Sequence, residues 1–354
     1  MVIGAGFAVI AMLLLALAPA LAQMPGGLAC KPSDPACLRM MLRHPVRQVE
    51  MWRSDLARPL DARIGAAPPA LVEYLTLDNL SHGYPQRPRV AILEPAFLAD
   101  VRSAVMELPP QVWRLFGERL AGVYFVDDLG GTGFTDLVRD AAGRPAGGYI
   151  VLDAAVLRPL TANAWATWKE GTPFKPQAGY GLAARIETEA GDNRKNAIQY
   201  ILLHELGHVL SIGNTIHPSW DMNPGDVPES AAYPYFDLSW TIDRRNRRYA
   251  TLFDRQFAQR RNVAYYFGAK LEAADMVQTY ASLEETNFPS LYAATAPGDD
   301  FAEAFASYVH VVLLHRPWEI ALSQGGKVVK VVRSCWDQPR CAAKRAVLEQ
   351  QLGR

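Results

Sequence analysis

The sequence predicts one α+β domain, mostly helical with a small mixed sheet. Apolar periodicity indicates helices early and late in the chain. Between them, residues 121–129 and 148–157 are rich in β-branched and aromatic residues, which is typical of strands. Helices, then a few strands, then helices again is an order found in α+β folds, and 354 residues are enough for one large core.

The first 22 residues contain no charged side chain and end in Ala20-Leu21-Ala22. Small residues in this spacing form the usual cleavage site of a signal peptide. We therefore expect residues 1–22 to be removed and the mature protein to be exported, either to the periplasm or to the medium. An uncleaved membrane anchor is the alternative, because the apolar run is long enough to span a bilayer. The Ala-x-Ala ending favours cleavage, so no stable membrane insertion is expected afterwards.

The chain has four cysteines in two close pairs, Cys30 with Cys37 and Cys335 with Cys341. An even number of cysteines in an exported protein indicates disulfides. Pairing within each close pair is the first expectation, and pairing between the two ends of the chain is the second. A cysteine zinc site is not expected, because neither pair has the two-residue spacing of such sites.

The mature chain is expected to contain an N-terminal helical extension packed on the core (23–80) and a main domain (81–354). The main domain carries a charged, helix-rich insertion at about 240–285. Its remaining segments are predicted, in order, as helix (95–120), glycine-rich turns (130–148), loop (162–190), helix (193–212), helix (299–315), one arm of a hairpin (325–335) and terminal helix (342–352).

Charges are balanced along the chain, with 36 basic and 36 acidic side chains and no basic tract. Proteins that bind nucleic acid usually carry a basic face or stripe. Nucleic acid is therefore not expected as a partner. The oligomeric state is left open by the sequence.

Three ionisable side chains, His204, Glu205 and His208, lie inside the apolar helix predicted at 193–212. Residues four apart share a helix face, so both histidines can bind one metal ion. Glu205 lies one position round, where its carboxylate can reach a metal-bound water and take its proton. Burying these groups without a partner is costly, which favours a metal site over a core helix with two hydrogen-bonded histidines.

Two histidines leave a zinc ion without a third protein ligand. The histidine-rich extension of this motif needs glycine at position 211 and histidine at position 214, but the chain has Ser211 and Asn214. His217 follows without metal-ligand spacing and is expected to be a loop or surface histidine. The third ligand is therefore expected elsewhere in the chain.

Two acids four residues apart, Asp299 and Glu303, begin the helix predicted at 299–315. Acids are favoured at a helix N-terminus, which explains Asp299 but not an acid at position 303 among apolar neighbours. One acid can bind the metal while the other hydrogen-bonds a metal-bound histidine. His310, on the same helix face as Glu303, is expected to be a partly buried histidine without a catalytic role.

Tyr292 precedes Asp299 by seven residues, and "DFAEAF" (Asp300–Phe305) follows it. Together with His204-Glu205-x-x-His208, this pattern resembles the gluzincin zinc metallopeptidases, most closely the anthrax lethal factor-like peptidase family. The resemblance covers only the two helices and the tyrosine. It implies a zincin-like metallopeptidase fold for the main domain.

The resemblance also implies roles for the individual residues. One Zn²⁺ would be held by His204, His208 and Asp299, Glu303 would hydrogen-bond a zinc-bound histidine, and Tyr292 would donate a hydrogen bond to the transition state. The family has glutamate where this chain has Asp299, which is one methylene shorter. Glu303 is therefore the alternative ligand.

The expected function is that of an exported zinc-dependent metallopeptidase with a protein or peptide substrate, in which Glu205 is the base. The alternatives are a catalytically inactive zincin-like binding protein and a zinc hydrolase acting on a non-peptide bond. Peptidases of this type present an edge strand beside the metal, to which the substrate adds as a further strand. Residues 147–157 are the candidate for this strand, and an ordinary core strand is the alternative.

Overall fold

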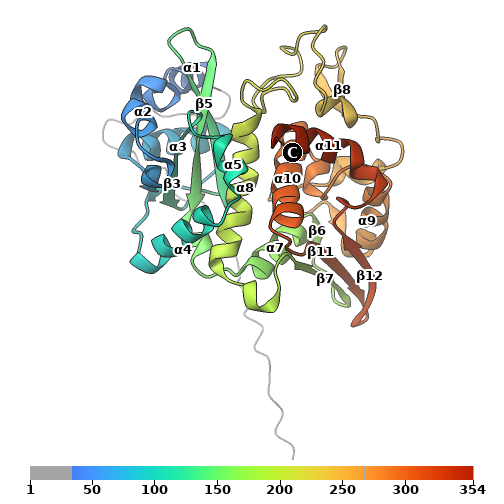
Figure 1. The fold of residues 1–354 in the computed structure, drawn as a ribbon. Helices are drawn as coiled ribbons and strands as arrows, with labels where there is room; N and C mark the ends of the chain where they lie inside the picture. The colour runs from blue at the N-terminus through green and yellow to red at the C-terminus, as the bar shows by residue number, and fades with distance from the viewer. Residues whose placement is uncertain (1–33, 267, 354) are drawn as a thin grey trace, which may run out of the picture.

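The computed structural model describes residues 34–266 and 268–353 (Figure 1). The α-helices of this part are α1 (Pro35–Leu42), α2 (Val49–Leu56), α3 (Pro69–His82), α4 (Pro95–Met106), α5 (Pro110–Arg114), α6 (Ala154–Leu157), α7 (Ala162–Gly171), α8 (Arg194–Ser211), α9 (Met276–Glu284), α10 (Pro297–Tyr308) and α11 (Ala342–Gln351). Its strands are β1 (Ile64–Ala66), β2 (Arg89–Val90), β3 (Leu120–Asp127), β4 (Gly133–Arg139), β5 (Pro145–Asp153), β6 (Phe174–Lys175), β7 (Tyr180–Arg185), β8 (Trp240–Asp243), β9 (Arg248–Thr251), β10 (Leu271–Glu272), β11 (Glu319–Gln324) and β12 (Lys327–Arg333). The prediction of a mixed helical and strand content with small sheets is confirmed.

The largest sheet is mixed and has the order β1-β3-β5-β4, with β2 paired to β3. β3 is parallel to β1 and β5, whereas β4 is antiparallel to β5. β5 therefore lies inside the sheet, and the interpretation of residues 147–157 as an edge strand is wrong. β4 is the edge strand, although its sequence lies within the glycine-rich segment that was predicted as turns.

Both faces of this sheet are covered, which explains why its central strands are almost continuously apolar. Alternate residues of β3 point to opposite faces, as the two-residue period of a strand requires. Val123 and Phe125 pack into the main core, whereas Tyr124 and Val126 pack into a second cluster beneath α1, α2 and α3. Strands buried on both faces show no polar alternation.

The N-terminal extension predicted at 23–80 belongs partly to the sheet. Its helices α1, α2 and α3 cover one face, as expected, but its strand β1 also pairs with β3. The predicted signal peptide (1–22) and Cys30 lie outside the described residues. Among the residues that are described, every helix is too short or too polar to cross a bilayer.

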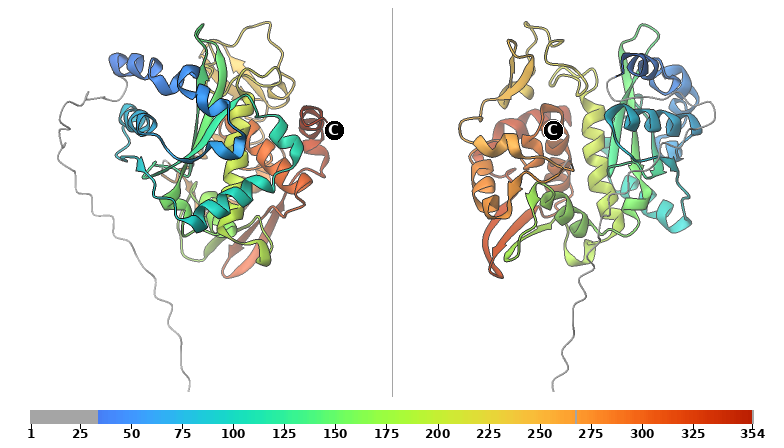
Figure 2. Two further views of the ribbon diagram at one scale, coloured as in Figure 1. Left: turned by 60° about the vertical axis from the view of Figure 1, so that its left-hand side comes forward. Right: turned by 180° about the vertical axis from the view of Figure 1, so that it is seen from behind.

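α8 stands upright in the middle of the molecule, between the sheet and the C-terminal helices (Figure 1), and the view from behind in Figure 2 shows the same arrangement. α10 packs directly against it. A Cβ on Gly207 would lie only 2.6 Å from Ala302 Cα, so glycine at this position permits the close approach of the two helices. Gly207 therefore allows the short distance between α8 and α10.

Two segments differ from their predicted structure. Residues 162–190, predicted as a loop, contain α7, β6 and β7. The insertion at about 240–285, predicted as helical, contains the β8–β9 hairpin, 3-10 turns and a single α-helix, α9. Its many charges form local pairs, such as Arg260 with Asp254 at 2.9 Å, instead of helical rows.

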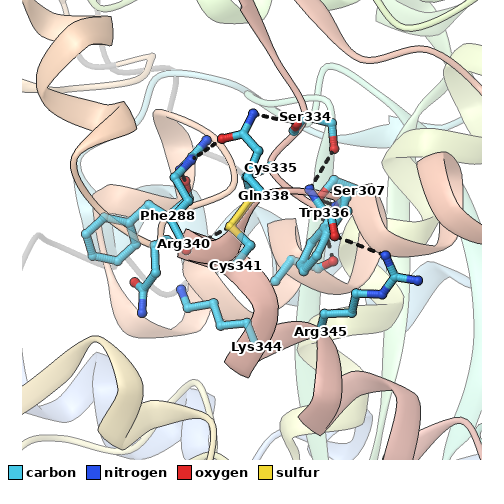
Figure 3. The surroundings of a disulfide bond; sticks show 12 residues. Phe288, Ser307, Ser334, Cys335, Trp336, Gln338, Arg340, Cys341, Lys344 and Arg345 are labelled. Carbon is cyan, nitrogen blue, oxygen red and sulfur yellow. Dashed lines mark hydrogen bonds between the residues drawn. A yellow bond between two sulfur atoms is a disulfide. The ribbon is translucent and has the colours of Figure 1, made fainter.

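The C-terminal part follows its prediction. β12 is the expected hairpin arm. Its partner β11, which was not predicted, joins it to β7 in one sheet, and α11 is the expected terminal helix. Cys335 and Cys341 form a disulfide just before α11 (Figure 3). Local pairing is thereby confirmed for these two cysteines, and pairing with the N-terminal cysteines is excluded for them.

Candidate metal centre

α8 supplies the first three side chains of the site. The Asn193 side chain accepts a hydrogen bond from Asn196 N and so caps the start of the helix. The helix then runs almost entirely through the core, which holds His204, Glu205 and His208 in fixed orientation. The helix predicted at 193–212 is therefore confirmed to within one residue at each end.

Two histidines and one aspartate form a group that could hold a metal ion: His204, His208 and Asp299, whose ligand atoms lie within 4.8 Å of one another. The Nε2 atoms of the two histidines are 3.2 Å apart, and His208 Nε2 is 3.8 Å from Asp299 Oδ1. Two imidazole nitrogens and a carboxylate oxygen that converge in this way fit a divalent cation. Asp299 reaches the group despite its short side chain.

Glu303 lies behind this group, where its oxygens contact other partners. Its Oε1 is 2.9 Å from His204 Nδ1 and 2.6 Å from Lys169 Nζ, while Oε2 accepts a hydrogen bond from Ser290 at 2.7 Å. Burial opposes ionisation, but Lys169 and His204 outweigh it and hold the pKa of this carboxyl well below its usual range. Glu303 is thus an anion that orients His204.

Glu205 is held between α8 and the edge strand β4. Thr135 of β4 donates a hydrogen bond of 2.6 Å to Glu205 Oε2. A Cβ on Gly133 would lie 2.3 Å from Glu205 Oε1, so glycine at this position lets the carboxylate take its present place. Burial raises the pKa of Glu205.

Tyr292 lies against the first histidine. Its ring stacks on that of His204 with centroids 5.5 Å apart, and Lys169 Nζ lies 4.8 Å from the Tyr292 ring centre. Burial raises the pKa of the Tyr292 hydroxyl well above its usual value, so the group stays protonated and can donate a hydrogen bond. The structure therefore brings together all six predicted residues, from His204 to Glu303.

The other two histidines considered in the sequence lie outside the metal group. His217 does lie in a loop, but it is buried, with Nδ1 2.6 Å from Pro218 O and its ring stacked on Phe301. His310 is also fully buried, and its Nε2 lies 2.7 Å from Ile186 O. His217 is thus the expected loop histidine, though buried, whereas the expectation that His310 is only partly buried is wrong.

Sequence reasoning missed Lys169, Thr135 and Ser290. Each acts on a site carboxylate. Lys169 is 134 residues from Glu303 and Thr135 is 70 residues from Glu205, whereas Ser290 is only 13 residues from Glu303. No local motif marks such partners. The only sequence signal is a lysine and a glutamate, Lys169 and Glu170, next to two tryptophans in a segment of apolar residues.

Two cavities meet at this site. One, of about 400 Å³, is lined by His208, Trp220 and Asp299, and the other, of about 390 Å³, by Lys169 and Glu303. Both are lined by Gly133, Phe134, His204, Glu205 and Tyr292. The candidate metal centre is therefore accessible from two sides.

Comparison with known proteins identifies no relative. No protein-family model matches the chain, and neither a curated protein nor a solved structure is significantly similar to it. The function must therefore be argued from the side chains of the site.

Proposed function

We propose that the protein is an exported zinc metallopeptidase with a zincin-like domain. The observation that carries the proposal is the convergence of His204, His208 and Asp299 beside the buried carboxyl of Glu205. Two imidazoles and a carboxylate are a common donor set of catalytic zinc, which keeps one position open for water or substrate. The adjoining cavities supply access to that position.

Zinc, when bound, would supply a Lewis acid that polarises the substrate carbonyl and activates water. Glu205 accepts the proton of the attacking water at its carboxylate. Its raised pKa moves this group toward the range of an effective base near neutral pH. Thr135 holds one of its oxygens in place.

Other residues of the chain orient the ligands and the substrate. Glu303 Oε1 lies 2.9 Å from His204 Nδ1 and favours the tautomer that carries its proton there, which leaves the Nε2 lone pair directed at the metal position. Tyr292 donates its hydroxyl hydrogen bond to the oxyanion that develops on the substrate. Removal of Glu303 would loosen the orientation of His204 and weaken metal binding, whereas removal of Tyr292 would take away a hydrogen-bond donor to the oxyanion.

A peptide substrate is favoured over other hydrolysable bonds by the position of β4. This strand is the edge of the sheet and contacts Glu205 through Thr135 and Gly133. An extended peptide can add to an edge strand through main-chain hydrogen bonds. The Cys335–Cys341 disulfide is compatible with export, because disulfides persist in oxidising compartments.

The test combines zinc content and hydrolysis. We expect about one zinc per purified mature chain by elemental analysis, and cleavage of an unfolded, dye-labelled casein. Glu205→Gln should keep the zinc and lose activity by about 100-fold or more, since the general base is gone. Asp299→Asn should lose zinc.

The matched control is Glu118→Gln, which changes an exposed glutamate away from the site and should leave both measurements unchanged. A stable protein without zinc, or a Glu205→Gln variant as active as the original protein, would contradict the proposal.

A further inference from the structure

A third and larger cavity adjoins the site. It has a volume of about 1010 Å³ and shares four wall residues, Gln86, Gly130, Gly131 and Tyr266, with the 390 Å³ cavity that contains His204 and Glu205. The two cavities therefore form one trough that leads away from the candidate metal centre. We call the larger one the outer cavity.

Aromatic rings follow the trough from the centre to the outer cavity. The Tyr266 ring lies 6.2 Å from that of Tyr292 and 5.6 Å from that of Trp168. Trp168 is 45% exposed, whereas the other seven tryptophans, all within the described residues, are buried or half-buried. An exposed tryptophan in a concave wall is unusual, because aromatic side chains contribute most when they are covered.

Tyr266 occupies its place at a cost in backbone energy. Its φ is 67°, in the left-handed region that a bulky L-residue avoids by about 1–2 kcal/mol. The preceding residue, Tyr265, is anchored, since its hydroxyl donates to Glu170 at 2.9 Å and its ring lies 4.6 Å from Tyr292. A strained residue that is held firmly at the junction of two cavities is typical of a functional contact.

Three charged residues line the outer cavity: Arg89 is exposed, whereas the two acids are hydrogen-bonded within the protein. Asp153 accepts hydrogen bonds from Leu129 N and Val156 N, and Asp128 accepts one from Arg87 N. The aromatic faces of Trp168 and Tyr266, with Arg89 beside them, are the surface that the outer cavity offers to a ligand. Such a surface selects an apolar side chain.

We propose that the outer cavity is an extended subsite for a polypeptide substrate, which places an apolar or aromatic side chain against Trp168, several residues from the cleaved bond. The proposal rests on the proposed function and specifies its substrate as an extended chain. β4 begins at Gly133, between the centre and the outer cavity, and offers main-chain groups to a peptide. A glycan could stack on the same rings but could not pair with this strand.

The test uses internally quenched peptides of two lengths. Peptides of about ten residues span about 33 Å when extended and can reach the outer cavity, whereas peptides of about four residues cannot. We expect Trp168→Ala to lower kcat/KM by about tenfold for long peptides with a distal leucine or phenylalanine, and by less than about twofold for short ones. Leu252→Ala, an exposed apolar residue of the insertion that lines none of the three cavities, is the matched control.

The outcomes separate the subsite from the function. Equal effects of Trp168→Ala on short and long peptides, or no effect on either, would overturn the subsite while leaving the peptidase intact. Failure of the unaltered protein to cleave any peptide would overturn the proposed function, and the subsite with it. Tighter binding of a chito-oligosaccharide than of long peptides to the Glu205→Gln protein would show that the rings serve a glycan.

Discussion

Two buried lysines pair with acids of the same helix, α10, but their surroundings differ. Lys169 of α7 lies 2.6 Å from Glu303 Oε1, beside His204 and Tyr292. Lys344 of α11 contacts both oxygens of Asp300, at 2.6 and 2.7 Å. Each pair is almost completely excluded from solvent.

The Lys344 pair is closed on itself, whereas the Lys169 pair faces the site. Asp300 also accepts hydrogen bonds from Trp240 and Tyr235, so each of its oxygens is satisfied within the protein. Glu303 instead contacts His204, a candidate metal ligand. The same kind of ion pair therefore serves two purposes. The Lys344–Asp300 pair supports the C-terminal helix α11, and the Lys169–Glu303 pair sets the electrostatics of the metal group.

The largest effect is expected for Lys344→Met. The substitution leaves the Asp300 carboxylate buried without its cation, which should reduce the free energy of unfolding by about 3–5 kcal/mol. Burial already lowers the pKa of Lys344 to about 8, against the opposing effect of Asp300, which shows how costly this position is for charge. Urea unfolding, with and without a zinc chelator, measures the loss.

The control is the double variant Lys344→Met/Asp300→Asn, which removes both charges and should recover much of the stability. Because the Lys344–Asp300 pair does not contact the metal group, Lys344→Met should lose the same unfolding free energy with and without zinc. A loss that depends on zinc would show that the Asp300 network is coupled to the site and would break the comparison.

Lys169→Met should instead give a loss that depends on the metal. Lys169 carries charge of the same sign as the metal ion, and its removal leaves the Glu303 carboxylate with His204 and Ser290 as its partners. Bound zinc then replaces part of the missing positive charge. We expect Lys169→Met to bind zinc about tenfold more tightly than the original protein does. Its loss of unfolding free energy should therefore be about 1.4 kcal/mol smaller with zinc bound than with zinc removed by a chelator.

Zinc titration measures the change in zinc affinity, and urea unfolding independently measures the change in unfolding free energy. Lys169→Arg, which keeps the charge, should retain the zinc affinity of the original protein more closely than Lys169→Met does. Equal losses with and without zinc would place Lys169 in the same structural role as Lys344.

Prediction from sequence succeeded where the signal was local. The apolar pattern of α8 and the spacing of His204, Glu205 and His208 are properties of one continuous segment. α10, the hairpin arm β12 and α11 were recognised for the same reason. The third ligand needed a resemblance, because nothing in α8 indicates a residue about ninety positions further on.

Prediction failed where distant contacts decide the structure. The segment 162–190 looks like a loop because Gly171, Pro173 and Gly179 interrupt it, yet the helix before them, capped by Thr161, carries Lys169 to the site. β4 was hidden by glycines, one of which is required by the approach of Glu205. Neither contact leaves a periodic trace in the sequence.

The spacing between α8 and α10 offers a smaller but sharp test of how the two halves of the site are joined. Gly207→Ala would place a Cβ 2.6 Å from Ala302 Cα, a main-chain atom that cannot rotate away. The helices must separate, which should cost about 1–3 kcal/mol of unfolding free energy. Because the separation moves Asp299 away from the histidines, zinc should also bind more weakly.

The control is Gly117→Ala, where the added methyl group meets no atom within 4 Å and stability should be unchanged or slightly increased. Zinc affinity and stability are measured together for both variants. If Gly207→Ala lowers stability but leaves zinc affinity intact, the helix contact supports the fold without setting the distance between Asp299 and the histidines.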